Sequence, residues 1–381
     1  MKKVIKLLSV MLLVLVFICL VGCKKEDEPK APVTVTDMVG RSVEVTPGEY
    51  KKVVCIGAGA LRLYCYIGDV ANLAGVEDID NSSLESRPKM FDGVARPYFI
   101  AYEEEFKTKK SCGVGGPQSQ TIETEKILNC DPDLVISEYE DADKANKLQS
   151  DLNIPVIVVS YGPNGVFDDK LHTSLLLIGE VLNLKAKAQT LVDFIKKEKA
   201  DIENRTKDID VSSQKKVYIC GLGNWGTTNH LMTAQNYEPF NIAHINNVVT
   251  GLAKNGIQQI EAEKFESLAP SMDVIIMDAA AIKNIKKLYQ DNPLLFDNCK
   301  AWQDGEVYVE LAYNAYYTNL EIALCNTWFN AKTLYPDKFS DIDINTKLNE
   351  ITKAFLGKEL ADEINAYPFA YGKANKETIF S

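Results

Sequence analysis

Arginine and aromatic side chains that could bind a small metal-containing solute lie in short loops of this sequence. Arg62 and Arg96 carry rigid guanidinium forks, which suit carboxylates and the catecholate or hydroxamate oxygens around a metal. Aromatic faces grip flat chelates and macrocycles, and the candidates in these loops are Tyr98, Tyr139, Trp225, Tyr313, Tyr316 and Tyr317. We therefore predict a ligand-binding site of arginine and aromatic residues, without a catalytic residue or a direct metal ligand.

Each of these residues also has a structural alternative. Arg62 could pair with an acid at the start of a helix, and Arg96 could pack over an aromatic ring. Tyr316 and Tyr317 cannot both face one pocket from a regular strand, because successive side chains of a strand point to opposite faces. One of these two tyrosines is expected to pack in the interior.

The sequence has three histidines, His172, His230 and His244, which is too few for a histidine-rich cage around a bare zinc ion. His230 lies in the same polar stretch as Trp225, so it could complete a metal's coordination sphere or hydrogen-bond a chelate. Packing in the core or at the surface is the alternative for His230. His172 is expected on a helix, without a role in the site.

Short runs rich in β-branched residues precede most of these loops and alternate with helical patterns. The runs cover residues 52–57, 133–137, 155–160, 216–221, 273–278 and 306–310. This alternation predicts α/β units with mainly parallel sheets, in two lobes that span residues 35–166 and 211–381. Ligands bind beyond the carboxyl ends of such strands, where the candidate loops lie.

A helical segment over residues 167–210 separates the two lobes. Its apolar residues recur at helical spacing, and Asn183 is expected to break it into a shorter and a longer helix. Charged residues dominate the longer part except along one stripe, as in a helix that is packed on one side. A single long helix between two lobes acts as a strut, so we expect lobe closure to be small.

The first residues have the pattern of an export signal, because three lysines precede an apolar run over residues 7–21. The run is too short to span a membrane, which takes roughly 20 apolar residues. It stops at a Leu-Val-Gly-Cys sequence that resembles the bacterial lipobox, so we predict a signal peptide at 1–22 and acyl chains on Cys23. Residues 23–34 are expected to be a charged tether, and an uncleaved membrane anchor is the alternative.

Composition narrows the class of protein further. Without the three lysines of the signal peptide, the formal net charge changes from −11 to −14, so nucleic acid is not expected as a partner. The body is too long for a single core, which agrees with two lobes. Seven cysteines are scattered along the body, and we predict that they are buried as small apolar residues rather than joined in a disulfide framework. They are Cys55, Cys65, Cys112, Cys130, Cys220, Cys299 and Cys325.

Several segments in order along the chain resemble the substrate-binding lipoproteins of ABC importers for ferric siderophores, haem and cobalamin. Residues 35–43 are similar to that family's opening hairpin, and residues 62–76 to its first helix and second strand. Residues 122–136 (IETEKILNCDPDLVI) match its most specific segment, with a weaker copy at 263–275. The resemblance implies two lobes joined by one helix, no intrinsic cofactor, a monomer, and delivery of a metal chelate to a permease and its ATPase.

The same resemblance implies permease docking through one acidic residue on each lobe. Glu125 matches the first-lobe position, although an ordinary solvated helix is the alternative. In the second lobe the family's usual acid is missing, because residues 244–248 read HINNV. Glu261 or Glu263 could take its place.

These observations favour a lipid-anchored protein on the outer face of the cell membrane that captures a metal chelate. A ferric siderophore is favoured because arginine and tyrosine dominate the candidate loops, while corrinoid, haem, a nickel or cobalt chelate and an oxyanion stay open. An enzyme is not expected, since no G-x-S-x-G, H-E-x-x-H or P-loop motif occurs. A sensory or adhesive lipoprotein on the same fold is the third possibility, and it would lack the docking acids.

Overall fold

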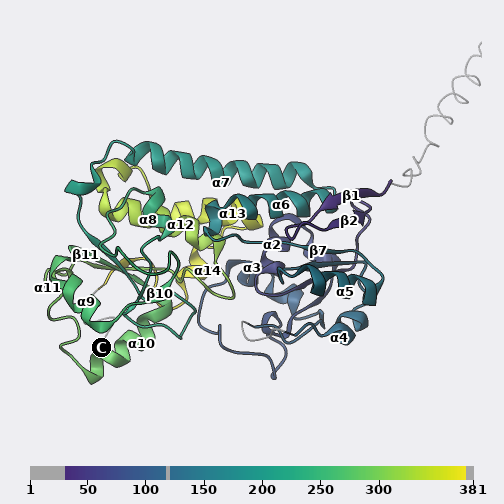
Figure 1. The fold of residues 1–381 in the computed structure, drawn as a ribbon, viewed down its shortest axis with the longest axis horizontal. Helices are drawn as coiled ribbons and strands as arrows, with labels where there is room; N and C mark the ends of the chain where they lie inside the picture. Colours follow the sequence, from purple (N-terminus) through teal and green to yellow (C-terminus); the bar gives the residue numbers. More distant parts are fainter. Residues whose placement is uncertain (1–30, 117–120, 375–381) are drawn as a thin grey trace, which may run out of the picture.

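The β-rich runs of the sequence form two separate sheets in the computed structural model, which describes residues 31–116 and 121–374 (Figure 1). All six strands predicted from these runs are present, as β3, β6, β7, β8, β11 and β12. The α/β class with mainly parallel sheets is confirmed. The bounds of the two lobes stay a prediction.

The first sheet consists of five parallel strands in the order β5-β4-β3-β6-β7. They are β3 (Val53–Ile56), β4 (Leu73–Val76), β5 (Lys110–Ser111), β6 (Leu134–Ser137) and β7 (Val156–Val158). Helices α2 (Ala60–Ile67) and α6 (Asp169–Val181) pack on one face, and α4 (Thr124–Asn129) and α5 (Ala142–Leu152) pack on the other. Because both faces are covered, β3, β6 and β7 are buried along their whole length.

The second sheet has four strands in the order β13-β12-β11-β8. They are β8 (Val217–Cys220), β11 (Val274–Asp278), β12 (Val307–Glu310) and β13 (Gly372–Lys373), of which only β13 runs antiparallel to its neighbour. One face is covered by α9 (Ala262–Leu268), α10 (Ala279–Asp291) and α11 (Lys300–Gln303). The other face is covered by α12 (Leu320–Leu334), and α13 (Ile344–Leu356) packs against α12.

Further strands and α-helices lie outside the two main sheets. β1 (Val33–Thr36) and β2 (Ser42–Val45) form the antiparallel hairpin expected near the start of the body, and β1 begins two residues before the predicted boundary at residue 35. β9 (Met232–Thr233) and β10 (Gln258–Gln259) form a second short pair. The remaining helices are α3 (Pro97–Phe106), α8 (Glu238–Ile242) and α14 (Ala361–Asn365).

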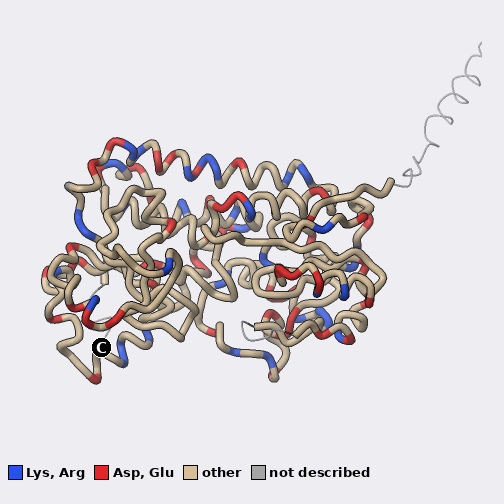
Figure 2. The backbone as a smooth tube through the Cα atoms, viewed as in Figure 1, with Lys and Arg blue, Asp and Glu red and all other residues tan. Residues whose placement is uncertain are grey.

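The helical segment between the sheets has the predicted break. α6 ends at Val181 and α7 (Lys185–Thr206) begins after Asn183, which takes a left-handed conformation with φ 56°. Figure 1 shows α7 running along one edge of the molecule past both sheets, and Figure 2 shows charges of both signs alternating along it. At 1.5 Å per residue, α7 is about 33 Å long, so it is long enough to connect the two lobes.

The two lobes share one continuous hydrophobic cluster. It includes Leu63 of α2 in the first lobe, Ile195 of α7, and Trp328 of α12 in the second lobe. Helix α13 also contacts α2 and α3 of the first lobe. A shared core of this kind resists large hinge motion.

The signal peptide and Cys23 lie outside the residues that the structure describes. Within the described ranges, no helix is both long enough and apolar enough to span a membrane. The seven cysteines of the body are all buried and form no disulfide bonds, which confirms their prediction as small core residues.

Candidate binding pocket

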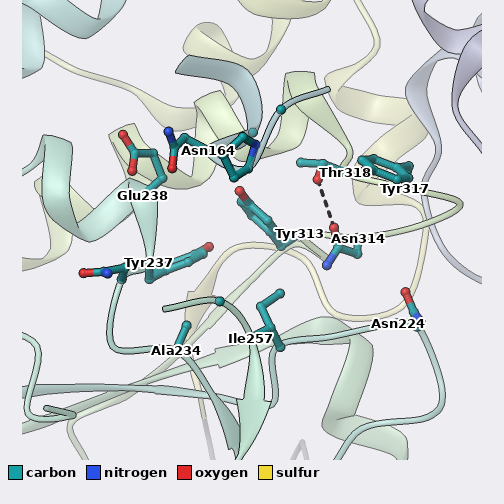
Figure 3. Close-up of a pocket in the computed structure, with 15 residues that line it drawn as sticks. Asn164, Asn224, Ala234, Tyr237, Glu238, Ile257, Tyr313, Asn314, Tyr317 and Thr318 are labelled. Atoms are coloured by element: carbon teal, nitrogen blue, oxygen red, sulfur yellow. Dashed lines mark hydrogen bonds between the residues drawn. The ribbon is translucent and has the colours of Figure 1, made fainter. Parts of the chain in front are cut away.

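A cavity of about 360 Å³ opens between loops that belong to both lobes (Figure 3). The first lobe contributes residues 162–165, which follow β7. The second lobe contributes residues 234 and 236–238 after β9 and residues 313, 314, 317 and 318 after β12, together with Asn224, Gly256 and Ile257. The cavity therefore lies beyond the carboxyl ends of strands, where ligands bind in open α/β sheets.

The lining is polar but almost uncharged. Its hydrogen-bonding side chains are the amides Asn164, Asn224, Asn236 and Asn314 and the hydroxyls Tyr237, Tyr313, Tyr317 and Thr318. Glu238 is the single Asp, Glu, Lys or Arg among the described residues that line the cavity. Burial raises the pKa of Glu238, and its hydrogen bond from Asn241 offsets this only in part. Amides and hydroxyls both donate and accept, so this pocket can hydrogen-bond a polar solute without supplying a positive charge.

The loop from Tyr313 to Thr318 forms one wall of this pocket. The Tyr313 backbone N–H donates to Oδ2 of Asp278 at 2.9 Å, and the Thr318 hydroxyl donates to Oδ1 of Asn314 at 3.2 Å (Figure 3). A Cβ added to Gly165 would lie 2.6 Å from the Tyr313 hydroxyl, so only glycine allows the loop from the first lobe to approach this ring so closely.

Arg62 does not line the pocket, although it was predicted to bind the ligand. It is 0% exposed, and its guanidinium donates to the backbone oxygens of Ala315 (2.6 Å), Tyr316 (3.0 Å) and Thr318 (2.8 Å). It also donates to Oδ1 of Asn319 at 3.0 Å. These partners occupy both terminal nitrogens of the guanidinium, so Arg62 supports the pocket wall from behind.

Arg96 and Tyr98 are likewise part of the interior. Arg96 forms a buried ion pair of 2.5 Å with Asp80, and the Tyr98 hydroxyl donates to the same carboxylate at 2.7 Å. The Arg96 guanidinium also lies 4.4 Å from the centre of the Phe99 ring. This is the structural alternative for Arg96, a guanidinium packed over an aromatic ring.

Tyr316 and Tyr317 have opposite environments. Tyr316 is 3% exposed, and its hydroxyl donates to Oε2 of Glu77 at 2.5 Å. Tyr317 is 37% exposed and lines the pocket. The expectation that one of the two packs is confirmed, but the reason differs, because both residues take left-handed backbone conformations rather than strand geometry.

The other predicted contacts lie away from the cavity lining. Tyr139 is half-buried after β6, and Trp225 is half-buried beside the lining residue Asn224. The His230 ring packs edge-on against Phe265 and Phe296 at 5.0 and 5.8 Å, and burial lowers its pKa to about 4. His230 therefore has the packing environment that was its alternative. Of the predicted residues, Tyr313 and Tyr317 line the pocket, and their contact with a solute stays a prediction.

Several lining residues were not predicted from the sequence. Asn164, Asn236 and Glu238 follow β7 or β9, and a signal for Asn164 was available in its glycine-rich loop after a strand. Residues 221–226 also have the spacing G-x-G-x-x-G, which is typical of dinucleotide sites when it opens a helix. Turns follow it here, and Asn224 within it lines the pocket, so the spacing builds a loop rather than a phosphate site.

Two carboxylates are buried below the pocket, at the ends of adjacent strands. Asp278 and Glu310 are register partners of β11 and β12, and burial raises the pKa of both. Glu310 accepts from the Tyr237 hydroxyl at 2.6 Å and from Nδ2 of Asn330 at 2.7 Å. Across the described residues, no group of three or more His, Cys, Asp or Glu side chains could hold a metal ion.

Glu125 is exposed in the first turn of α4. This position leaves its carboxylate accessible from outside the molecule, as docking on a partner requires. Its docking role stays a prediction.

Comparisons with known proteins confirm the resemblance noted in the sequence. The sequence model of the family described as "Periplasmic binding protein" matches residues 53–310. The molybdate-binding protein MolA of Haemophilus influenzae is 23% identical over 258 residues, which cover 62% of this chain and 70% of MolA.

Solved structures share the fold. A periplasmic solute binding protein from Veillonella parvula matches with a TM-score of 0.68 and 18% identity, over 89% of this chain and 97% of that protein. MolA bound to molybdate matches with a TM-score of 0.65 and 20% identity, over 86% of this chain and 98% of that protein. These relatives are solute-binding proteins rather than enzymes.

Proposed function

The chain belongs to the periplasmic binding protein family, and from this premise we propose that it captures a solute outside the cell and delivers it to the permease and ATPase of an ABC importer. The observation that carries the proposal is the cavity of about 360 Å³, which residues of both lobes line. A solute held in such a cavity contacts both lobes at once. A partner that also contacts both lobes can therefore distinguish the solute-bound protein from the empty one.

We propose a compact metal complex without net negative charge as the solute. The described lining offers amides and hydroxyls, no Lys or Arg, and one carboxyl group on Glu238. An anionic complex would lose its hydration there without gaining an opposite charge. The two arginines that had favoured an anionic siderophore, Arg62 and Arg96, are occupied by interior partners.

Charge balance then selects among ferric siderophores. Three hydroxamate groups neutralise ferric iron, whereas three catecholates leave a net negative complex. The cavity volume also lies near the lower end of the range of about 300–1,000 Å³ for small-molecule sites, which favours a compact complex over a haem or corrinoid macrocycle. A neutral complex of ferric iron with small hydroxamate ligands satisfies both conditions.

A molybdate-type oxyanion is the second candidate. It is favoured by the similarity to MolA and by the amide and hydroxyl donors of the pocket, since an oxyanion can be held by neutral hydrogen bonds. The carboxyl group of Glu238 opposes it unless that group is protonated, and its raised pKa makes protonation easier.

The location and docking complete the proposal. Acyl chains on Cys23 would hold the protein on the outer face of the cell membrane, close to its permease and at high effective concentration. The exposed Glu125 would pair with a basic site on the permease. Loss of uptake in a Glu125→Ala variant, with unchanged solute affinity, would support this docking role.

Calorimetric titration of the mature protein with a panel of probes tests the function. We expect binding of ferric tris(acetohydroxamate), and binding of ferric tris(catecholate) that is at least tenfold weaker. Molybdate binding with no binding of the hydroxamate complex would select the second candidate. Tight binding of haemin or cobalamin, or of the catecholate complex, would contradict the charge and size argument.

A further inference from the structure

The segment Ala315–Asn319 belongs to the second lobe by sequence but is bonded to the first lobe. It follows β12, yet the carbonyl oxygens of Ala315, Tyr316 and Thr318 all accept from the guanidinium of Arg62 in α2 of the first lobe. Asn319 adds a second contact, because its Nδ2 donates to the backbone oxygen of Ala95 at 3.0 Å.

A second anchor holds the same segment by a side chain. The Tyr316 hydroxyl donates to Oε2 of Glu77 and accepts from the backbone N–H of Gly116 at 3.0 Å. Glu77 is itself fixed, because its Oε1 accepts from the backbone N–H of Gly57 at 3.1 Å. Burial raises the pKa of Glu77 to about 7, while the bonds from Tyr316 and Gly57 favour its ionised form.

The backbone between these anchors is strained. Tyr316 and Tyr317 have φ values of 53° and 70°, and side chains with a Cβ rarely adopt this left-handed region. Two such residues in succession persist only when their surroundings over-determine the conformation. The carbonyls that converge on Arg62 require this turn, so Arg62 acts as the template on which the turn is built.

The outer side of the same turn is the wall of the pocket. Tyr317 and Thr318 line the cavity, and Asn314 lines it just before the anchored segment. Their positions therefore depend on contacts made on the other side of the chain, by first-lobe residues that do not line the cavity.

We propose that Arg62 and Glu77 are positioning residues that lock the Ala315–Asn319 segment into the first lobe and so preorganise the pocket wall before a solute arrives. The anchoring stands on the contacts alone, whereas its effect on affinity rests on the proposed solute-binding function. Preorganisation of this kind raises affinity because less ordering remains to be done on binding.

The test uses Tyr316→Phe, which removes one hydroxyl and leaves the ring. The matched control is Tyr308→Phe, because the Tyr308 hydroxyl also donates to a carboxylate, that of Glu306, on the second lobe's strand β12 and away from the segment. Amide hydrogen exchange of residues 313–319 is followed by mass spectrometry in the full mature protein without added solute. We expect at least tenfold faster exchange in Tyr316→Phe, and the wild-type rate in the control.

Affinity for ferric tris(acetohydroxamate) is measured on the same variants, and we expect it to fall about tenfold in Tyr316→Phe alone. Glu77→Gln keeps an acceptor for only one of the two donors, the Tyr316 hydroxyl and the Gly57 N–H, so its exchange rate should lie between those of wild type and Glu77→Ala. Glu77→Ala should resemble Tyr316→Phe. Unchanged exchange in both Tyr316→Phe and Glu77→Ala would overturn the anchoring.

Faster exchange with unchanged affinity would overturn the preorganisation of the pocket. If wild type binds none of the probes, the proposed function fails, and the exchange rates still decide the anchoring. Arg62→Lys, which can reach fewer carbonyls with one ammonium group, should accelerate exchange more than Tyr316→Phe does.

Discussion

The two sides of the chain around Tyr316 and Tyr317 differ in every property that decides a residue's role. On the inner side, Tyr316 contacts the buried charged groups Glu77 and Arg62, and its hydroxyl and backbone oxygen both form hydrogen bonds with them. On the outer side, Tyr317 faces a cavity lined by amides and hydroxyls. The charged residues of the first lobe therefore fix its architecture, while uncharged polar groups are left for recognition.

The largest effect is expected when a charge is removed from the buried interior of the first lobe. Asp80→Ala would leave Arg96 buried without its ion-pair partner, and loss of one member of a buried pair costs about 3–5 kcal/mol. Urea unfolding should show this loss of free energy, while affinity for ferric tris(acetohydroxamate), measured where the variant is folded, should stay within about twofold.

Glu359→Ala is the control, because Glu359 pairs with Lys353 at the surface and such pairs contribute about 0–1 kcal/mol. A large loss of affinity in Asp80→Ala with little loss of stability would contradict the structural role of the buried Asp80–Arg96 pair. Arg96 would then belong to the binding site after all.

A smaller effect is expected from the buried carboxylates below the pocket. The folded-state pKa values of Asp278 and Glu310 are raised by burial above the ordinary values near about 4, so the folded protein holds protons that the unfolded chain releases. Stability from these groups is complete below about pH 4 and is lost as the pH rises through their folded-state pKa values. The midpoint temperature of thermal unfolding should therefore decrease as the pH rises from about 5 to about 8.

Glu310→Gln should flatten this fall. The glutamine keeps an acceptor for the Tyr237 hydroxyl, and the Asn330 amide can turn over to accept from its new NH2 group. Glu306→Gln is the control, because Lys373 lowers the pKa of Glu306 and its substitution should not flatten the curve. Parallel curves for wild type and Glu310→Gln would show that the buried pair does not set the pH dependence.

The sequence predicted the fold well because its signals are local. β-branched runs located six strands, and a helical period with Asn183 at its break located α6 and α7. Hydrophobic periodicity and turn residues depend on near neighbours along the chain, so they can be read without knowing the packing.

The site was predicted only in part because its geometry is not local. Arg62 and the carbonyls that it binds are more than 250 positions apart in sequence, with separations from 253 to 256, so no pattern around Arg62 shows that its guanidinium is occupied. Tyr316 and Tyr317 are adjacent and identical in type, and the left-handed turn that separates their environments depends on those distant contacts. The loops that follow the strands predict the region of the site, whereas tertiary contacts determine which of their residues face the cavity.

Affinity of Tyr317→Asn for ferric tris(acetohydroxamate) tests whether the cavity is the solute-binding site. Asparagine tolerates the left-handed conformation of Tyr317, so the variant should fold. It loses the ring that packs 4.4 Å from the Tyr161 ring, centroid to centroid, so the free energy of unfolding should fall by roughly 0.5–3 kcal/mol while the pocket loses an aromatic face. We expect calorimetry to show at least tenfold weaker binding than wild type. Wild-type affinity in this variant would contradict the assignment of the cavity as the solute site.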